Sequence, residues 1–368
     1  MGDRPFDRRN FIRFGIGALG GLSIFGLREL IKRNESDGKD KVKKDYNSNN
    51  DSNNDSNKGS DKNKGEKDLQ EKDLQDDDKD IKKINDIPFR KLGKTGLNVS
   101  LIGLGSGAGA IPQENGATEE DAYELINTSL NEGINYIDTA PSYANGLSEE
   151  NIGEVMKTRR DETILATKTQ RRDYDGVMRE IEASLNRLKT DYIDIYQLHG
   201  LSNLGDVTSV LSENGAVKAL DKLRAEGVIK YTGVTGHNDP EVLLEAIEGY
   251  EFDCLLMPLN TGDVHSKPFQ GKLLERATKK EMGIIAMKVV AYGRLLREDG
   301  VDSMKRALSY VYTFPISTAI LGISNLDQLK ENLEITRGYE KLSKNELQEL
   351  ENMTVHYEYE ANFFKHEW

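Results

Sequence analysis

From residue 87 onward, short β-branched runs alternate with amphipathic segments, and this alternation restricts the possible folds more than any other feature of the chain. The runs predicted to form strands cover residues 100–104, 135–138, 163–167, 193–198, 231–235, 254–258, 284–287 and 318–321. The helical patterns between them include residues 119–131, 176–188, 217–225, 240–248, 272–281 and 304–313. Eight strands that alternate with helices over about 280 residues predict an α/β fold, the (β/α)8 or TIM barrel.

The alternation alone leaves a doubly wound parallel sheet as the competing fold. Residues 89–99, just before the first predicted barrel strand, carry Gly93 and Gly96 at turn positions. This pattern predicts an N-terminal β-hairpin that caps the bottom of the barrel.

The charge of the chain divides it into three segments. Residues 1–33 carry seven basic and three acidic side chains, residues 34–86 carry twelve and sixteen, and residues 87–368 carry 31 and 44. A chain with a formal net charge of −13 is a poor candidate for nucleic-acid binding, which depends on neutralising phosphates. The single cysteine, Cys254, excludes an intrachain disulfide and a cysteine-cluster metal site, and we expect no metal.

The first segment, residues 1–33, resembles a twin-arginine export signal. Arg8 and Arg9 precede the residues NFIR and an apolar run at 14–27, which has the length of a signal-peptide core and is short for a bilayer span. We therefore expect export by the twin-arginine machinery to the periplasm or the outer face of the cytoplasmic membrane. Cleavage of the leader and its retention as a membrane tether both stay open. An ordinary amphipathic helix on a cytoplasmic protein is the alternative.

Residues 34–86 are dominated by Asp, Asn, Ser and Lys and contain a tandem repeat, EKDLQ, at 66–70 and 71–75. Their few apolar side chains bury too little surface to offset the entropy lost on ordering. We expect a disordered, low-complexity linker that joins the leader to a barrel domain at residues 87–368.

Four polar residues follow the second, third and fourth predicted strands, at the end of the barrel where such enzymes carry their active sites. Asp138 and Lys168 end two of these strands, Tyr143 follows Asp138 closely, and His199 comes directly after the fourth strand. Singly, they are explained equally well as a cap, a surface lysine and a buried imidazole. Together, they suggest that Asp138 balances the Lys168 charge. Because a nearby ammonium favours the phenolate, we expect a lowered pKa for Tyr143, as a general acid needs.

The motifs around these residues resemble the aldo-keto reductase family. They are NYIDTAPSY at 135–143, SEENIG at 148–153, ATK at 166–168 and SLNRLKTDYIDIYQLH at 184–199. The resemblance spans residues 88–335. It implies a barrel that reduces an aldehyde or ketone to an alcohol, or the reverse, with a nicotinamide dinucleotide. It also implies Tyr143 as proton donor, Lys168 paired with Asp138 as the group that tunes its pKa, and His199 as the group that orients the substrate carbonyl.

The same resemblance implies cofactor contacts, and it favours NADP(H), with NAD(H) as the alternative. The residues at matching positions are Thr235, Gly236, Asn260, Lys288, Gly322, Ser324, Gln328, Glu331 and Asn332. The chain lacks the Lys near Gly322 and the Arg at Gln328 that grip a 2′-phosphate in many relatives. At Met287-Lys288 it also lacks an aromatic residue that stacks on the nicotinamide ring.

Other interpretations stay open at this point. One is a non-catalytic NAD(P)-binding sensor or regulatory barrel, and another is a metal-dependent barrel hydrolase, although His237 and His265 lack partners at ligand spacing. The Gly-rich residues 103–109 imitate a dinucleotide fingerprint but suit a loop beside the pocket better. We expect variable loops at residues 108–116 and 201–215 and the tail after Thr354 to form the walls of the substrate pocket. Whether the aromatic side chains of the tail line this pocket or pack on the barrel stays open. The tail histidines, His356 and His366, have no expected chemistry.

Overall fold

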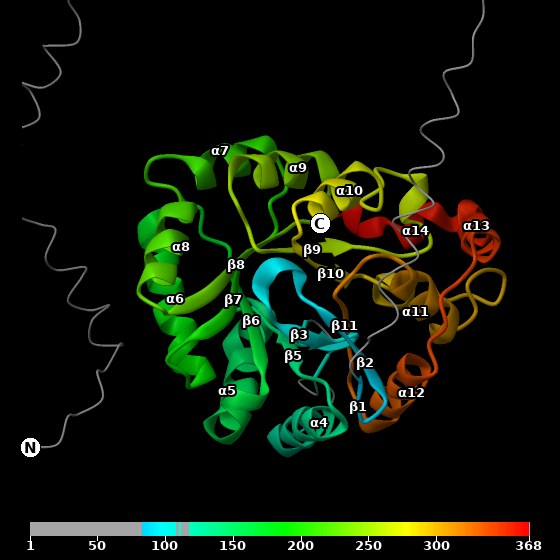
Figure 1. The fold of residues 1–368 in the computed structure, drawn as a ribbon, viewed down its shortest axis with the longest axis horizontal. Helices are drawn as coiled ribbons and strands as arrows, with labels where there is room; N and C mark the ends of the chain where they lie inside the picture. The colour runs from blue at the N-terminus through cyan, green and yellow to red at the C-terminus, as the bar shows by residue number, and fades with distance from the viewer. Residues whose placement is uncertain (1–82, 108–109, 112–117, 368) are drawn as a thin grey trace, which may run out of the picture. The chain divides into compact units, whose positions relative to one another are not determined.

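The computed structural model describes residues 83–107, 110–111 and 118–367 of the chain. The predicted leader and residues 34–82 of the predicted linker therefore lie outside the described residues. Within them, eight parallel strands close into a barrel, with β11 paired to β4 (Figure 1). The strands are β4 (Ile102–Gly105), β5 (Tyr136–Asp138), β6 (Ile164–Thr169), β7 (Ile193–Leu198), β8 (Ile229–Thr235), β9 (Cys254–Pro258), β10 (Gly283–Met287) and β11 (Thr318–Gly322). The predicted barrel is confirmed, and the doubly wound sheet is wrong.

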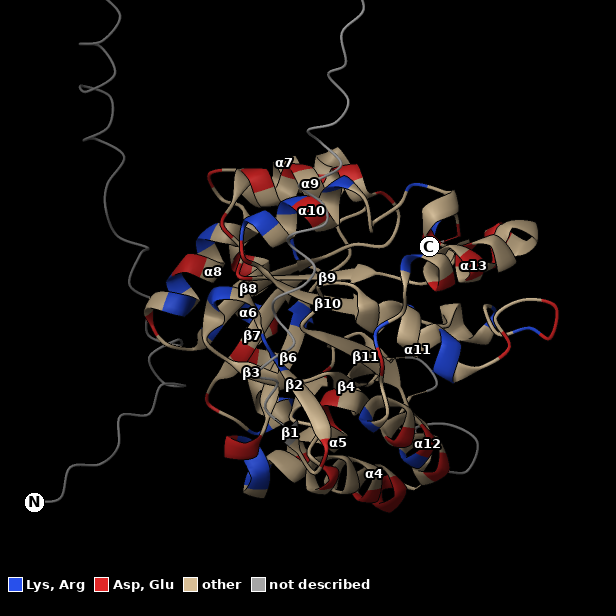
Figure 2. Cartoon of the chain, turned by 45° about the vertical axis from the view of Figure 1, so that its right-hand side comes forward, with Lys and Arg blue, Asp and Glu red and all other residues tan. Residues whose placement is uncertain are grey.

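Helices surround the barrel, and both acidic and basic residues occur along them (Figure 2). They are α4 (Glu119–Glu132), α5 (Leu147–Arg159), α6 (Tyr174–Leu188), α7 (Leu204–Leu211), α8 (Ala216–Ala225), α9 (Pro240–Gly249), α10 (Lys272–Lys279), α11 (Met304–Thr313), α12 (Leu326–Arg337), α13 (Lys344–Met353) and α14 (Glu358–Ala361). All six helices predicted from the pattern are present. Among the described residues, no helix is both long and apolar enough to span a membrane.

The helix α7 lies inside residues 201–215, which the sequence analysis treated as a loop. Its eight residues are rich in valine and give a weak helical signal, but Asn203 caps its first turn and Val207 and Val210 are buried. Capping and tertiary packing therefore form a helix that propensity alone does not predict.

A three-stranded antiparallel sheet covers the N-terminal ends of the barrel strands. It consists of β1 (Lys83–Ile84), β2 (Ile87–Lys91) and β3 (Asn98–Ser100), so the predicted hairpin has one further strand, inside the predicted linker. Leu92, directly after β2, and Val99 of β3 join the core cluster at the centre of the barrel. Between β2 and β3, Gly93 has a φ of 51°, and a Cβ there would lie 2.3 Å from the backbone nitrogen of Gly283. The sheet thus closes one end of the barrel and leaves the other end for a site.

Candidate active site

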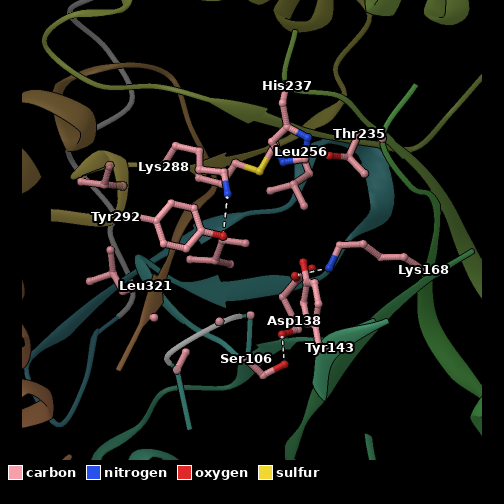
Figure 3. A pocket seen from close by; sticks show the side chains of 18 of the residues that line it. Ser106, Asp138, Tyr143, Lys168, Thr235, His237, Leu256, Lys288, Tyr292 and Leu321 are labelled. Atoms are coloured by element: carbon pink, nitrogen blue, oxygen red, sulfur yellow. Dashed lines mark hydrogen bonds and ion pairs between the residues drawn. The ribbon is translucent and has the colours of Figure 1, made fainter. Parts of the chain in front are cut away.

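A cavity of about 790 Å³ lies at the C-terminal ends of the barrel strands. Residues in or directly after all eight strands line it, from Gly105 of β4 to Gly322 of β11. Figure 3 shows that the side chains of Asp138, Tyr143 and Lys168 lie together on one side of this cavity.

Lys168 is the buried cation of the cavity, with a side chain that is 1 % exposed. Its ammonium forms a salt bridge with the Asp138 carboxylate and donates a hydrogen bond to the carbonyl oxygen of Thr139 (2.7 Å). The other oxygen of Asp138 accepts a hydrogen bond from the Gln197 amide (3.0 Å). Burial lowers the pKa of Lys168, but Asp138 and Tyr143 more than offset this effect and raise it above its ordinary value. Lys168 therefore stays charged.

Tyr143 reaches the same cation from the loop between β5 and α5. The Lys168 Nζ lies 4.9 Å from the centroid of its ring, and the ring meets that of His199 edge-on, with the centroids 5.9 Å apart. Residues 144–146 follow with φ values of 47°, 54° and 95°, and this left-handed turn leads directly into α5. The four residues proposed for catalysis, Asp138 included, are thus brought together in one cavity.

The expected lowering of the Tyr143 pKa is wrong. Burial of the phenol raises its pKa, and although the Lys168 charge and hydrogen bond lower it, they do not compensate, since Asp138 acts in the same direction as burial. The phenol therefore stays protonated at neutral pH, which is the form that a proton donor requires. An alkoxide is a much stronger base than a phenolate, so donation to a reduced carbonyl oxygen remains favourable.

His199 follows β7 directly, and its backbone N–H donates to the carbonyl oxygen of Thr169 (2.8 Å). Burial, followed by the charges of Lys168 and of the other cationic groups nearby, lowers the pKa of His199 well below its ordinary value. The imidazole is therefore neutral, with one donor nitrogen and one acceptor. Its Nδ1 atom is buried and has no hydrogen-bond partner among the described residues, as expected of a group placed to meet a ligand.

The SEENIG motif at residues 148–153 lies in α5 and holds this helix against its neighbours. Glu149 is fully buried, accepts a hydrogen bond from the Thr167 hydroxyl (2.6 Å) and pairs with Arg187 (2.6 Å). Gly153 lets α5 approach α6 so closely that a Cβ there would lie 2.0 Å from the carbonyl oxygen of Arg187. The motif therefore docks α5 against β6 and α6, and α5 holds the loop that carries Tyr143.

Lys288 and Tyr292 lie on the loop after β10, and both line the cavity (Figure 3). The Lys288 ammonium donates to the Tyr292 hydroxyl (3.1 Å). Burial and the charge of Lys168 lower the pKa of Lys288 to about 7. Tyr292 was not predicted from the sequence, although it places an aromatic ring at the cavity from the loop that follows Met287. The only signal for it was an aromatic residue next to Gly293 in a loop after a strand end.

Five of the nine predicted cofactor residues line the cavity. They are Thr235, Lys288, Gly322, Ser324 and Gln328. The Thr235 hydroxyl is fully buried and has no hydrogen-bond partner in the described part of the chain, so a bound ligand can satisfy it. In the first turn of α12, the Gln328 side chain accepts hydrogen bonds from the backbone N–H and the hydroxyl of Ser324 (3.0 Å each). This donor set fits a dinucleotide that lies between β8 and α12.

The other four predicted cofactor residues do not line the cavity; they are Gly236, Asn260, Glu331 and Asn332. Asn260 instead donates its amide to the carbonyl oxygens of Lys288 (3.2 Å) and Ala361 (3.3 Å). It therefore ties the loop after β10 to the C-terminal tail, and the prediction that it faces the cofactor has no geometric support.

The tail after Thr354 packs on the barrel, which is one of the two alternatives left open by the sequence, and it contributes no described residue to the cavity lining. Its anchor is Lys365, which forms a fully buried salt bridge with Asp263 (2.6 Å) and donates to the carbonyl oxygen of Ser266 (2.6 Å). Of the expected wall residues 108–116, only 110 and 111 are described, and Ala110 lines the cavity.

Three of the other four histidines make contacts away from the cavity. His265 contacts the carbonyl oxygen of Glu351 (2.9 Å), His356 contacts Asp299 (3.2 Å), and His366 stacks on a tyrosine of the tail. Buried His237 lines the cavity, and burial followed by two nearby lysines lowers its pKa to about 3. Among the described residues, no group of three or more His, Cys, Asp or Glu side chains is arranged to hold a metal ion.

Comparison with known proteins identifies the same fold and similar sequences. A model described as the aldo/keto reductase family matches residues 102–306. L-galactose dehydrogenase from Arabidopsis thaliana is 29 % identical over 294 residues, which cover 70 % of this chain and 90 % of that enzyme.

Two solved structures are similar over most of their length. An aldo-keto reductase from Bacillus halodurans, in its holo form, has a TM-score of 0.62 and 27 % identity, and the match covers 73 % of this chain and 96 % of that chain. An aldo-keto reductase from Klebsiella pneumoniae in complex with NADPH has a TM-score of 0.59 and 24 % identity, and the match covers 71 % of this chain and 93 % of that chain.

Proposed function

The chain belongs to the aldo/keto reductase family of oxidoreductases, and we propose that it interconverts an aldehyde or ketone and its alcohol with Tyr143 as the proton donor. The observation that carries this proposal is the Lys168 ammonium, buried between the Asp138 carboxylate and the Tyr143 ring at the wall of a cavity. A non-catalytic sensor needs a ligand cavity but has no use for a charged lysine buried beside a protonated phenol.

In the proposed reaction, a bound nicotinamide dinucleotide supplies the hydride for reduction. The neutral imidazole of His199 donates a hydrogen bond to the carbonyl oxygen and orients it. The Tyr143 hydroxyl then gives its proton to that oxygen as negative charge develops there, and the Lys168 ammonium stabilises the phenolate left behind. Asp138 keeps Lys168 charged and in place. In the oxidation direction, the Tyr143 phenolate accepts the proton of the alcohol.

We propose NADP(H) as the preferred cofactor, with NAD(H) as the alternative. The complex of the Klebsiella pneumoniae protein with NADPH and the fit of Thr235, Lys288 and Ser324 support a nicotinamide dinucleotide. The preference for the 2′-phosphate rests on the family alone, because Gln328 stands where relatives carry an arginine. Titration of the protein with NADPH and NADH, followed by fluorescence, measures this preference directly.

The test of the catalytic assignment is Tyr143→Phe, which removes the hydroxyl and keeps the ring. We expect dinucleotide affinity to remain and carbonyl turnover to fall by about 10² to 10⁴-fold. The control is Tyr359→Phe, the same change at an exposed tyrosine of the tail, which should leave turnover unchanged. Unaltered turnover in Tyr143→Phe would reject the assignment. A wild-type protein that binds the dinucleotide but turns over no carbonyl compound would favour the sensor.

The substrate is a small carbonyl or alcohol compound whose identity a turnover screen has to establish. Aldehydes, ketones and sugars belong in this screen, and L-galactose is included because a relative is named for it. The direction of reaction is read from the same screen run with oxidised and reduced dinucleotide.

We also propose that the leader exports the protein by the twin-arginine route. This proposal rests on Arg8 and Arg9 and the apolar run after them. Fractionation of cells that produce the full chain should place it outside the cytoplasm, and replacing both arginines with lysine should retain it inside. If the full chain and the variant with both arginines replaced are distributed equally between the cell fractions, the twin-arginine proposal is rejected. Finding both proteins in the cytoplasm would favour a cytoplasmic enzyme.

A further inference from the structure

Arg172 joins the loop after β6 to the segment that carries His199, and it lines the cavity. Its Nη2 donates to the carbonyl oxygens of His199 (2.9 Å) and Gly200 (3.0 Å). Its Nη1 donates to the carbonyl oxygen of Gln170 (3.3 Å), and its Nε pairs with Asp206 (3.3 Å). One planar guanidinium therefore contacts four groups, from the loops after β6 and β7 and from the helix α7, which the single ammonium of a lysine is unable to do.

Asp206 in turn fixes the guanidinium to the first turn of α7. Its second oxygen accepts hydrogen bonds from the backbone N–H (2.9 Å) and the hydroxyl (3.0 Å) of Ser202. Burial acts to raise the pKa of Asp206, but these bonds and the charge of Arg172 lower it below its ordinary value. Asp206 is therefore ionised at neutral pH, and the helix α7 holds the ion pair of Arg172 and Asp206 in place.

The segment held by Arg172 has little freedom left. The His199 N–H donates to the carbonyl oxygen of Thr169 on one side, and the Leu201 N–H donates to that of Thr235 on the other (2.8 Å each). Gly200 between them has a φ of 64°, so the chain turns sharply behind His199. Without Arg172, the carbonyl oxygens on both sides of this turn lose the donor they share.

From these contacts we propose that Arg172 and Asp206 form a positioning pair that orients His199 toward the substrate carbonyl. This inference rests on the proposed function, in which His199 hydrogen-bonds to that oxygen. The pair acts through His199 and takes no part in proton transfer itself. It extends the site beyond the four residues of the family motifs to the helix α7.

The electrostatics of His199 agree with this geometry. The phenol ring of Tyr143 contacts the His199 ring, and the titratable groups that act on its charge are Lys168, His237, Arg172 and Lys288, of which Lys288 has a pKa of about 7. After burial and Lys168, the charge of Arg172 is among the causes that lower the pKa of His199. Removal of Arg172 should therefore raise this pKa toward its ordinary value, and the His199 ring should gain a proton at a higher pH.

The variants that test the pair are Arg172→Met and Arg172→Lys, with Arg171→Met as the matched control. Arg171 is the exposed neighbour, whose guanidinium lies 3.4 Å from Glu180, so its loss removes the same charge one residue away. Arg172→Met should lower kcat by about 10- to 100-fold with dinucleotide affinity unchanged, because a misplaced orienting group costs rate. Its acid limb in the pH–rate profile should move to higher pH. Arg172→Lys should leave the acid limb of the pH–rate profile at the wild-type position but lower kcat. Arg171→Met should leave both the acid limb and kcat unchanged.

Titration of the His199 ring by NMR in the free protein provides a readout that needs no turnover. An Arg172→Met protein with the kcat and the His199 titration of Arg171→Met would overturn the inference. If Arg172→Met does not fold, Asp206→Asn replaces it and should lower kcat by about 3- to 10-fold, because the bonds of Arg172 to the carbonyl oxygens remain. Unchanged kcat in a folded Asp206→Asn protein also overturns the pair. A shifted His199 titration in a protein that turns over no carbonyl compound supports the pair's hold on His199 and refutes the reductase function.

Discussion

Replacing Asp138 with Asn removes the charge that keeps Lys168 ionised, with almost no change in shape. The two side chains are 2 % and 1 % exposed, so water is unable to take over the role of the carboxylate. Breaking a buried pair in this way costs about 3–5 kcal/mol of unfolding free energy. Lys168 escapes part of this cost by losing its proton, since only its neutral form tolerates burial alone. We therefore expect the free energy of unfolding of the variant, measured relative to the wild type, to rise with pH.

In the wild type, the pKa of Lys168 is raised above its ordinary value of 10.5, so its contribution to stability is constant below that pH and is lost only above it. In Asp138→Asn, the folded-state pKa falls below the ordinary value, and the unfolded chain binds one more proton than the folded one. The free energy of unfolding then rises with pH by up to about 1.4 kcal/mol per unit. At pH 7, the loss relative to an ordinary lysine reaches at most about 5 kcal/mol.

The assay is urea denaturation followed by circular dichroism at several values between pH 6 and pH 9, with the wild-type curve subtracted. The double variant Asp138→Asn/Lys168→Met removes the buried cation as well, so it should lose the slope and recover part of the stability. A single variant whose stability stays flat or falls with pH in this range would refute the reasoning. The buried lysine would then have another source of charge compensation.

Two further predictions follow from Lys288 and Gly153. Because Lys288 has a pKa of about 7, raising the pH from 6 to 8 should remove its charge and weaken dinucleotide binding by up to about tenfold. Lys288→Met should bind the dinucleotide weakly at both pH values. Fluorescence titration measures this affinity, and a wild type whose affinity is independent of pH would exclude an ionic contact between Lys288 and the dinucleotide. Gly153→Ala would place a Cβ 2.0 Å from the carbonyl oxygen of Arg187 and should cost about 3 kcal/mol in thermal unfolding, whereas Gly338→Ala meets its nearest atom at 3.5 Å and should stay within about 0.5 kcal/mol.

The barrel and the four clustered polar residues could be predicted from sequence because both depend on short-range patterns. Buried parallel strands appear as continuous apolar runs, as in residues 254–258 and 284–287. Once eight such runs form a barrel, the residues at their C-terminal ends must converge, and this brings Asp138, Lys168 and His199 into one cavity.

The features that sequence reasoning missed depend on burial and on loop geometry. The pKa of Tyr143 is raised because desolvation outweighs the nearby ammonium, and desolvation is not visible in a motif. Tyr292 lines the cavity from a loop in which its own φ is 57°, a backbone conformation that the sequence does not predict. Asn260 occupies a strand end like the catalytic residues, yet its amide is taken up by the carbonyl oxygens of Lys288 and Ala361.

The buried salt bridge between Lys365 and Asp263 has a consequence for the synthesis of the protein. Its two residues are 102 positions apart, so Lys365 is synthesised long after the loop that carries Asp263. All eight barrel strands are complete before then, but the loop after β9 waits for its lysine. A chain whose synthesis stops before Lys365 therefore leaves the buried Asp263 without its counter-ion, and it should be degraded by proteases instead of persisting as a slower enzyme.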